Sequence, residues 1–344
     1  MRILFIAPVI QDMYKDIEAE MVRQGHEVVV IRDQILRADP YKVSCPLLVP
    51  VKNIVWSKLS KKHWDNIIAY DERIRQPFDL VFIISGVSVN KQILNYLKDQ
   101  NPNIRSVFYT WDACNYYRFD RFLSLVDKCY TFELEDVKND SRWHFLPIYC
   151  KDQKQVQQQQ QDYEYDLFTI GSSHGGRYSF LKKILPQLKE NNVRYYIRVV
   201  TQPLSLSMRD KVRMLFLSKE RKAQILEEIR FSNGLENKEI LSETKILHDK
   251  YQKISDSSRC VLDDQREGQS GLTARFMWAL AAGKKVITTN KWAYQYSFVS
   301  KEQVAIFDKN NPKMPLDFIQ TPLYLKSDVR EFYIDNWVAT VLSE

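Results

Sequence analysis

The hydrophobic pattern at the start of the chain predicts a strand, an amphipathic helix and a second strand. A short β-rich run at residues 2–6 is followed by apolar side chains at every fourth position, namely Met13, Ile17 and Met21. The next strand is predicted at residues 27–31. Two buried strands joined by a helix pair in parallel through a right-handed crossover, so this stretch predicts the first repeat of an α/β sheet.

The same alternation of strand and helix continues to residue 132. The pattern predicts a strand at residues 78–85, a helix at 90–97, and strands at 106–111 and 128–132. The strands are continuously apolar rather than alternately apolar and polar, which is typical of strands buried on both faces. We therefore expect a parallel sheet that is covered by helices on both sides.

The pattern breaks at residues 151–163, where the sequence KDQKQVQQQQQDY contains no apolar repeat. We interpret it as an exposed linker between domains, the alternative being a long surface loop within one domain. The alternation then restarts, with strands predicted at 165–170, 194–200, 259–263, 285–289 and 303–307, and helices at 178–188, 208–230, 244–254, 272–282 and 327–342.

The predicted fold class is therefore α/β, with two Rossmann-like doubly wound domains. The N-terminal domain covers residues 1–150, the linker 151–163 and the C-terminal domain 164–325. The last stretch, 326–344, is a C-terminal helix that can cross back to the N-terminal domain. A chain of 344 residues agrees with two domains, since a domain averages about 150 residues.

Composition and charge narrow the class further. The chain is 44% hydrophobic with only 9 Gly and 12 Pro, which excludes collagen-like and disordered proteins. Its 5 Cys form no CxxC pair and no zinc-site spacing, so we expect a reducing, cytoplasmic environment. No apolar run is long enough for a membrane span. The net charge of +7 suits an anionic ligand or membrane surface and is too small to indicate nucleic acid.

Ligands of open α/β sheets bind beyond the carboxyl ends of the strands, so residues that follow predicted strands are the candidates. The first candidate is the loop GSSHGGR, which contributes Gly171, Ser172, His174, Gly175, Gly176 and Arg177. Backbone N–H groups, a helix N-terminus and a guanidinium together suit a diphosphate. The alternative is a tight strand–helix turn with no ligand.

The second candidate follows the predicted strand 259–263. The loop and the first turn of the next helix contribute Gln269, Ser270, Gly271, Leu272, Thr273 and Arg275, with the helix expected to begin at Leu272. A hydroxyl group, exposed N–H groups and an arginine at a helix start again favour an anion. Both loops are therefore predicted to bind the donor diphosphate.

Several motifs resemble a known family. WALAAGKKVIT (278–288) is similar to the segment with which glycosyltransferases of the GT-B architecture bind nucleotide sugars. GQSGLTAR (268–275) and KKVITTN (284–290) resemble motifs of bacterial capsule and lipopolysaccharide glycosyltransferases related to CgeB-like proteins, as do GSSHGGR and the YTWDA around Asp112. The resemblance implies the GT-B architecture, with two domains facing across a cleft, and sugar transfer during surface polysaccharide assembly.

One position departs from the GT-B pattern. Many of these enzymes carry a glutamate that binds the ribose hydroxyls, and Trp278 stands at that position here. Tryptophan cannot accept those hydrogen bonds. Asp263 and Asp264 precede the second loop and are the expected nucleoside ligands instead, while Trp278 is expected to pack in the core.

The acceptor site is expected after the strand 106–111. Transfer to a hydroxyl group with inversion needs a base, and a carboxylate in an aromatic pocket can serve because burial raises its pKa. Asp112 is the expected base, and Trp111, Tyr116 and Tyr117 are expected to stack on sugar rings. Asp12 and His144 are rival bases, and a helix cap is the alternative role of Asp112.

The remaining expectations concern partners. The chain shows no DxD-type carboxylate motif, so we expect no metal and no cofactor. The expected substrate is a UDP-linked sugar, and the expected acceptor is a glycan or a lipid-linked glycan. The basic segment 208–222 carries an apolar stripe and can lie on the inner face of the cytoplasmic membrane, or pack on its own domain. Two alternatives to transfer stay open, a sugar-nucleotide epimerase and a nucleotide-sugar-binding protein without turnover.

Overall fold

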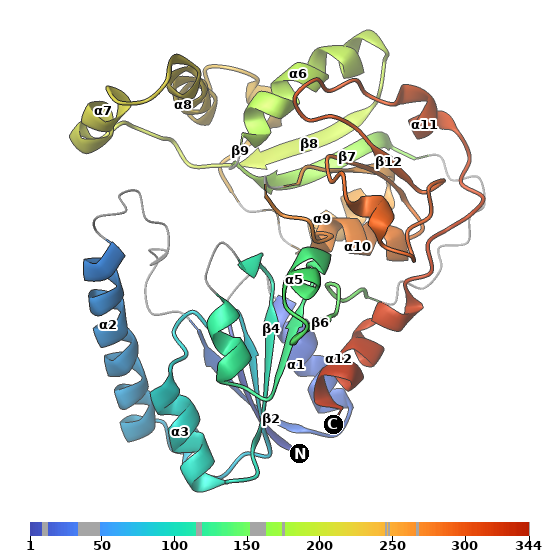
Figure 1. Cartoon of the computed structure of the whole chain (residues 1–344). Helices are drawn as coiled ribbons and strands as arrows, with labels where there is room; N and C mark the ends of the chain where they lie inside the picture. Colours follow the sequence, from blue (N-terminus) through green and yellow to red (C-terminus); the bar gives the residue numbers. More distant parts are fainter. Residues whose placement is uncertain are drawn as a thin grey trace. The chain divides into compact units, whose positions relative to one another are not determined.

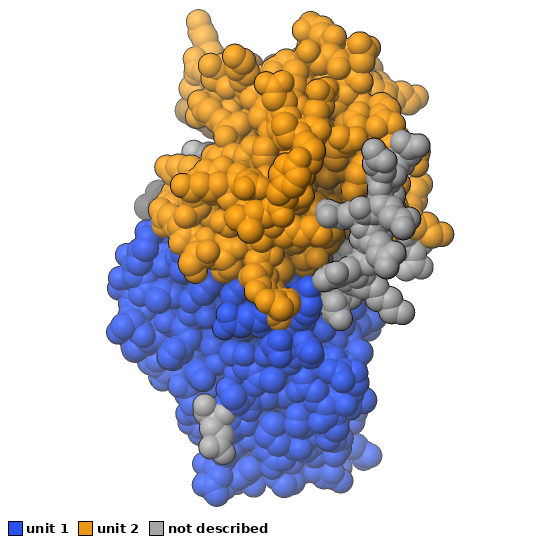
Figure 2. Space-filling view, turned by 90° about the vertical axis from the view of Figure 1, so that its right-hand side faces the viewer, with its two compact units in different colours: residues 1–150, 269–272, 331–344 blue, residues 151–268, 273–330 orange. Residues whose placement is uncertain are grey.

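The computed structural model describes residues 1–8, 13–33, 49–114, 119–151, 163–173, 176–244, 246, 248–265 and 268–343. They form two compact units, which have different colours in Figure 2. Unit 1 comprises residues 1–150, 269–272 and 331–344, and unit 2 comprises residues 151–268 and 273–330. Each unit contains one six-stranded sheet.

The sheet of unit 1 is parallel throughout, with the strand order β2-β1-β3-β4-β5-β6. Its strands are β1 (Arg2–Ala7), β2 (Glu27–Arg32), β3 (Leu80–Ile84), β4 (Arg105–Thr110), β5 (Lys128–Thr131) and β6 (Trp143–Phe145). Phe5 of β1 stacks on Phe82 of β3 with ring centroids 5.2 Å apart, while the neighbouring Leu4 and Ile83 belong to the core on the other face. The continuous apolar runs of the sequence therefore fill two cores, one on each face of the sheet.

Helices cover both faces of this sheet. Figure 1 shows α2 (Val49–Tyr70) and α3 (Lys91–Gln100) on one side and α1 (Met13–Arg23) and α12 (Ile334–Leu342) on the other. The shorter helices of the unit are η2 (Glu72–Ile74), η3 (Phe119–Ser124) and α5 (Leu134–Asn139), and η6 (Arg330–Phe332) precedes α12.

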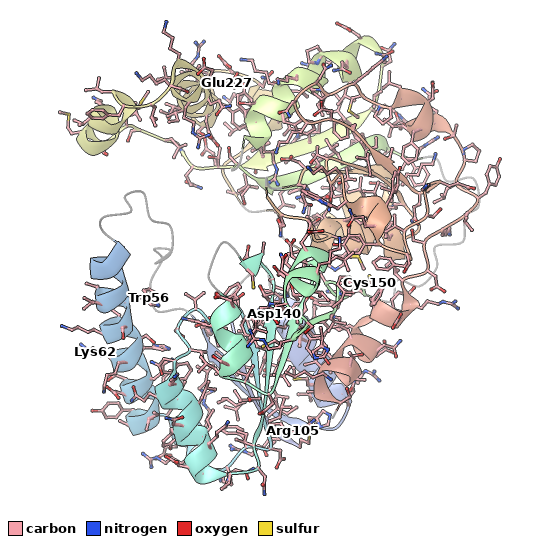
Figure 3. The ribbon with its side chains drawn as sticks, viewed as in Figure 1. Trp56, Lys62, Arg105, Asp140, Cys150 and Glu227 are labelled. Atoms are coloured by element: carbon pink, nitrogen blue, oxygen red, sulfur yellow. The ribbon has the colours of Figure 1, made fainter. Side chains whose placement is uncertain are left out.

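Helix α12 completes the core of unit 1. Trp337 is fully buried, its Nε1 donates to the carbonyl of Pro147 at 2.9 Å, and its ring lies edge-on to Tyr109 with centroids 5.0 Å apart. Arg105 donates to two carbonyl groups at the C-terminal end of the helix at 3.0 and 3.2 Å. At its other end, the backbone of Cys150 donates to the carbonyl of Phe332 and accepts from the N–H of Ile334 (Arg105 and Cys150 are labelled in Figure 3). The last residues of the chain are thus an integral part of the unit that its first residues form.

The sheet of unit 2 is also parallel, with the order β12-β11-β10-β7-β8-β9. Its strands are β7 (Tyr165–Ser172), β8 (Tyr195–Val200), β9 (Leu241–Ser242), β10 (Ser258–Asp263), β11 (Lys285–Thr288) and β12 (Val304–Ile306). The helices are α6 (Arg177–Glu190), α7 (Met208–Met214), α8 (Lys219–Ser232), α9 (His248–Asp256), α10 (Ala274–Ala281) and α11 (Leu316–Gln320), with the short η4 (Lys238–Ile240) and η5 (Ala293–Gln295). In Figure 1, α6 lies on one side of the sheet and α9 and α10 on the other.

The predicted fold class is confirmed in each unit, because both sheets are parallel, doubly covered and Rossmann-like. Several boundaries differ from expectation. The single helix predicted at 208–230 is two helices, since Ser218 caps α8 by accepting from the N–H of Arg221 at 3.2 Å. The predicted C-terminal helix begins only at Ile334. The sequence pattern did not indicate α2, β6 or β9, and Asp12, the rival candidate for the base, lies outside the described residues.

No helix in the described ranges is long and apolar enough to cross a membrane, the 22-residue α2 included.

A tight turn after β3 supplies a test of the packing in unit 1. Gly86 has φ +55°, and a Cβ there would lie 2.6 Å from Ile83 Cγ2 and 2.7 Å from Phe122 Cζ. Gly25, which ends α1, has φ +88° with no atom within 4 Å of such a Cβ. Gly25→Ala should therefore cost only the left-handed strain of about 1–2 kcal/mol, whereas Gly86→Ala adds an overpacking cost of about 1–3 kcal/mol. Urea unfolding of the two variants measures the difference, and equal losses would show that the turn yields to the added methyl group.

Candidate functional site

The strand order of unit 2 identifies where a ligand is expected. The strands β7 and β10 are neighbours at the centre of the sheet, and the chain runs outward from them in opposite directions, to β8 and β9 on one side and to β11 and β12 on the other. In open α/β sheets, ligands bind at the carboxyl ends of the strands at this switch point. Each of the two predicted diphosphate loops follows one of these strands. The loop 171–177 comes at the end of β7, and the loop that contains residues 269–275 comes after β10.

The first loop leads directly into α6. Gly176 is the N-cap of the helix, with φ +76°, and Arg177 is its first residue. The guanidinium of Arg177 is almost fully buried, donates from Nη1 to the carbonyl of Ser172 at 2.6 Å and pairs through Nε with Asp264 Oδ2 at 3.3 Å. A Cβ at Gly171 would collide with Arg177 Nη1, so a glycine is needed there to leave room for the guanidinium. His174 and Gly175 lie outside the described residues.

Asp263 is the centre of a second set of interactions, at the end of β10. Its carboxylate has no exposed surface and accepts from Thr273 Oγ1 at 2.7 Å, Thr288 Oγ1 at 3.2 Å and Arg275 Nη1 at 3.4 Å. Arg275 also donates from Nη2 to the carbonyl of Ile170 at 2.9 Å. Burial raises the pKa of Asp263, and Arg275 opposes that shift. The two aspartates thus hold two arginines at adjacent strand ends.

These residues form a charged cluster that we define as Arg177, Asp263, Asp264, Arg275 and Lys309. Lys309 pairs with Asp264 Oδ1 at 2.7 Å, so three cations meet two carboxylates and the cluster carries an excess positive charge. Burial lowers the pKa of Arg177, as does the neighbouring Arg275, while Asp264 and Asp263 oppose that shift. A bound anion would supply the missing charge, because guanidinium groups pair strongly with phosphate oxygens.

The remaining predicted diphosphate ligands are distributed over both units. The helix predicted to begin at Leu272 starts at Ala274, because Thr273 is its N-cap and accepts from the N–H of Phe276 at 3.2 Å. Residues 269–272 belong to unit 1. There the backbone N–H of Ser270 donates to Glu133 Oε2 at 2.8 Å, and its hydroxyl group donates to the same oxygen. The Ser270 donors predicted to bind an anion therefore bind a carboxylate of the chain itself.

Gly271 lies against Phe132, the residue that follows β5 in the same unit. A Cβ on it would collide with the ring of Phe132 and would lie 2.8 Å from the carbonyl oxygen of that residue. The glycine of this predicted loop is therefore explained by a close approach of two backbones.

The expected acceptor residues follow β4. Asp112 is half-buried, its N–H donates to Thr110 Oγ1 at 3.1 Å, and the Thr110 hydroxyl group donates back to its carbonyl. Trp111 is buried, and its Nε1 has no hydrogen-bond partner among the described atoms. Tyr116 and Tyr117 lie outside the described residues. The rival base His144 is an exposed residue of β6 whose ring lies 5.8 Å from that of Tyr130.

Two buried carboxylates at strand ends of unit 1 were not singled out from the sequence. Asp33 follows β2 and accepts from the N–H groups of Val87 and Ser88 at 2.5 and 2.7 Å, which fixes the loop after β3. Glu133 follows β5, and its Oε1 is buried with no partner among the described atoms. Burial raises the pKa of both carboxyl groups. Both come within two residues of a strand end, so the rule that identified Asp112 also applies to them.

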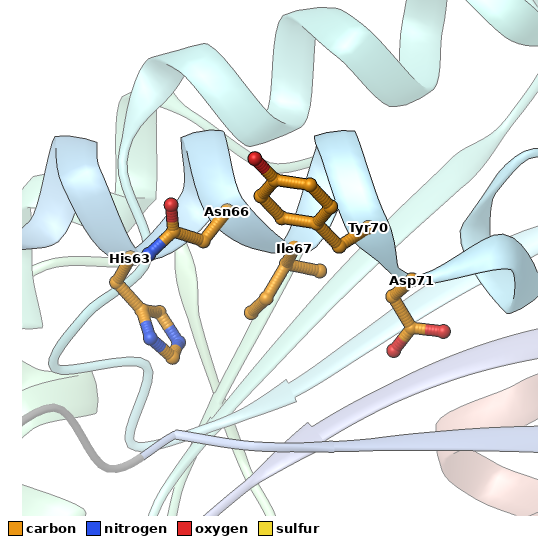
Figure 4. A pocket seen from close by; sticks show the side chains of 5 residues that line it. All are labelled: His63, Asn66, Ile67, Tyr70 and Asp71. Atoms are coloured by element: carbon orange, nitrogen blue, oxygen red, sulfur yellow. The ribbon is translucent and has the colours of Figure 1, made fainter.

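A surface pocket of about 530 Å³ lies along α2, away from the residues predicted to act. Figure 4 shows its lining side chains, which are His63, Asn66, Ile67, Tyr70 and Asp71. Burial lowers the pKa of His63, whose Nε2 has no partner in the described part of the chain. Within that same part, no group of three or more His, Cys, Asp or Glu side chains is placed to hold a metal ion.

Trp278, which replaces the ribose-binding glutamate of the family pattern, is a partly exposed residue of α10. Its ring lies edge-on to Tyr251 of α9 with centroids 6.4 Å apart. Trp278 therefore contributes to packing between the two helices on this side of the sheet, but it is not among the buried residues of the core, where it was expected.

Comparison with known proteins gives structural matches only. No family model matches the chain, and no curated protein matches it in sequence. A UDP-forming α,α-trehalose-phosphate synthase from Burkholderia xenovorans has a TM-score of 0.54 at 10% identity, covering 99% of this chain and 98% of that chain. The UDP-GlcNAc 2-epimerase of Methanocaldococcus jannaschii, in complex with UDP-GlcNAc and UDP, has a TM-score of 0.53 at 10% identity, covering 100% and 99%.

The N-terminal domain of the Candida albicans trehalose-6-phosphate phosphatase also matches, with a TM-score of 0.53 at 11% identity, covering 98% of this chain and 95% of that chain. Identities this low show the fold alone. The chain has the GT-B fold, with two Rossmann-like domains, that glycosyltransferases and sugar-nucleotide epimerases share.

Proposed function

We propose that the protein is a glycosyltransferase that moves a sugar from a nucleotide-sugar donor to an acceptor hydroxyl group. The observation that carries the proposal is the charged cluster at the switch point of unit 2, whose three cations exceed its two carboxylates. A nucleoside diphosphate is the anion that matches this charge and this place in the fold. The structural matches include proteins whose names specify UDP or a UDP-sugar, which supports a nucleotide sugar as donor.

The donor diphosphate would be held by Arg275, by the loop 171–177 and by the N-terminus of α6. These groups neutralise the negative charge that develops on the departing diphosphate, which in this proposal replaces a metal ion. Arg177 lies behind the loop and adds to the positive potential. Asp263 and Asp264 remain the proposed nucleoside ligands, although ribose hydroxyls can reach them only if their present contacts with Thr273, the two arginines and Lys309 open.

The acceptor would bind at unit 1, with Asp112 as the base that takes the hydroxyl proton if the configuration inverts. Trp111 would contribute an apolar surface and Tyr116 and Tyr117 would stack on sugar rings. The motifs of the last third support a glycan of the bacterial surface as acceptor, either capsule, O-antigen or lipopolysaccharide, with the enzyme acting in the cytoplasm. A lipid-linked glycan would also bring the enzyme to the inner face of the membrane.

Calorimetric titration with UDP, GDP, CMP, TDP and ADP tests the donor site. We expect one nucleotide to bind with a dissociation constant of about 100 μM or less, and Arg275→Ala to weaken it at least about tenfold, since a charge-assisted pair contributes about 1.5–3 kcal/mol. Arg330→Ala, which removes an exposed guanidinium from unit 2, should leave binding unchanged.

Three outcomes would contradict the proposal. Failure of all five nucleotides to bind wild-type protein would remove the donor site. Isomerisation of the sugar nucleotide without an acceptor would identify an epimerase. Binding of a sugar nucleotide without transfer to any acceptor glycan would identify a binding protein without turnover.

A further inference from the structure

Unit 2 carries an exposed apolar surface in a segment that we call the basic apolar segment, residues 204–222. It contains α7, the turn after it and the first residues of α8. Four large apolar side chains are strongly exposed, with Met208 at 74%, Val212 at 53%, Leu215 at 71% and Phe216 at 85%. Met208 and Val212 lie one turn apart on the same face of α7, and Leu215 and Phe216 lie in the turn that follows it. They cover no core, so folding of the unit does not explain them.

Positive charge surrounds these apolar side chains in the sequence. The segment contains six basic residues, Arg209, Lys211, Arg213, Lys219, Arg221 and Lys222, against the two acidic residues Asp210 and Glu220. Three of the basic residues lie between Met208 and Leu215 along the chain, and the other three follow Phe216. Apolar side chains with a basic surround are complementary to a bilayer surface that is rich in anionic phospholipid, where lysine and arginine meet headgroups and apolar groups enter the interface.

The segment is attached to its own unit at both ends, and at its start Asn233 Nδ2 donates to the carbonyl of Leu204 at 2.8 Å. The C-terminal half of α8 is docked on α6, where Phe231 stacks on Tyr178 with centroids 3.9 Å apart. Glu227, labelled in Figure 3, accepts from Ser179 Oγ at 2.5 Å and from Lys182 Nζ at 2.9 Å. Helix α7, in contrast, projects away from the sheet of its own unit beyond the β8–β9 edge (Figure 1). The apolar side chains are therefore carried on the part of the unit that extends furthest from its core.

A second copy of the chain fits this surface less well than a membrane does. A stable protein interface buries about 800 Å² on each partner and involves about 20–30 residues on each side, far more than four apolar side chains supply. In a two-fold dimer the same patch would also face itself, so that its basic residues would repel one another. A membrane surface has neither limitation.

We propose that the basic apolar segment is a membrane-docking site for bilayers rich in anionic phospholipid. Met208, Val212, Leu215 and Phe216 enter the interface, and the basic residues of the segment lie among the headgroups. Docking would bring the enzyme to a lipid-linked acceptor, so the biological purpose of the docking rests on the proposed function. The docking itself depends only on the surface of unit 2.

Co-sedimentation with vesicles tests the docking without any transferase assay. The wild-type protein should bind vesicles of phosphatidylcholine with 30 mol% phosphatidylglycerol at least about tenfold more tightly than vesicles of phosphatidylcholine alone, and 0.5 M NaCl should abolish most of the difference. Leu215→Ser with Phe216→Ser should weaken binding at least about tenfold. The double change Lys219→Glu with Lys222→Glu should do the same.

A matched control is available in the same unit. Tyr324 and Leu325 are also adjacent, large and exposed, at 84% and 60%, and Tyr324→Ser with Leu325→Ser should leave vesicle binding unchanged. Equal binding to both kinds of vesicle, or an equal loss in this control, would overturn the proposal. A concentration-dependent dimer that disappears in the Leu215/Phe216 variant would instead assign the surface to a second copy. Nucleotide binding without vesicle binding would overturn the docking and leave the donor site intact.

Discussion

Asp263→Ala is expected to lower the free energy of unfolding by about 3–5 kcal/mol, the cost of breaking a buried ion pair by removing one partner. The carboxylate of Asp263 has no exposed surface and accepts from Thr273, Thr288 and Arg275. Without it, three cations of the charged cluster would share the single carboxylate of Asp264. The buried hydroxyl group of Thr288 would also lose its acceptor, which adds to the loss.

Urea unfolding followed by circular dichroism measures this loss. Asp263→Asn should lie between wild type and Asp263→Ala, because the amide keeps the size of the side chain and one acceptor oxygen. Glu190→Ala removes the same charge from an exposed position at the end of α6 and should change the free energy by less than about 0.5 kcal/mol. A loss at Asp263 as small as the loss at Glu190 would mean that the buried cluster rearranges without cost.

Inorganic diphosphate offers a second readout on the same variants. An anion that binds the charged cluster only in the folded protein raises the free energy of unfolding by mass action. Because Asp263→Ala increases the excess positive charge, added diphosphate should restore more stability to this variant than to wild type. Equal stabilisation of the two would show that the anion binds elsewhere.

Asp112→Asn is expected to lower the turnover number of sugar transfer by about 10²–10⁴-fold, the range that general base catalysis contributes. The amide has almost the same size as the carboxylate but cannot take up the acceptor proton. The dissociation constant of the nucleotide should stay the same, because Asp112 is not among the proposed donor ligands, which belong to unit 2. Steady-state kinetics with the donor identified by titration separates these two quantities.

The same experiment distinguishes Asp112 from the buried Glu133, which is a second candidate for the base. Its Oε1 is unpaired within the described structure and burial raises its pKa, so it is a rival for the role of base. Glu133→Gln and the exposed control Asp120→Asn should be assayed beside Asp112→Asn. If Asp112→Asn keeps more than about a tenth of the turnover number while Glu133→Gln loses it, the base is Glu133. A large loss in the Asp120 control would show that any change of charge near η3 disturbs the reaction.

The strands of both sheets could be predicted because their residues are apolar on both faces. β3 is a continuous apolar run and β10 has an apolar centre at residues 260–262, and each strand lies within about two residues of its predicted position. β6 and β9 have three and two residues, which is too short for a periodic signal. The start of α10 was placed too early because the capping role of Thr273 depends on its hydrogen bond to Phe276, which the pattern of apolar residues does not encode.

The sequence predicted the positions of the candidate site residues but not which residues interact with each other. Loops after β7 and β10 were identified because ligands gather at strand ends, yet the pairing of Arg177 with Asp264 joins residues 87 positions apart and depends on which strands are neighbours. Asp33 and Glu133 could have been found by the same rule, since each comes within two residues of a strand end. Lys309 could not, because only the packing of β12 beside β11 brings its chain segment to Asp264.

The position of Trp337 has a consequence for the order in which the protein matures. A ribosome makes residues 1–150 first, but the indole that fills their core emerges about 190 residues later, a delay of about 10–40 s at 5–20 residues per second. Every residue of unit 2 is synthesised within that interval. The unit that is translated first is therefore the last to close, and its nascent form exposes Tyr109 and Phe82 to the chaperones of the cell until the end of the chain arrives.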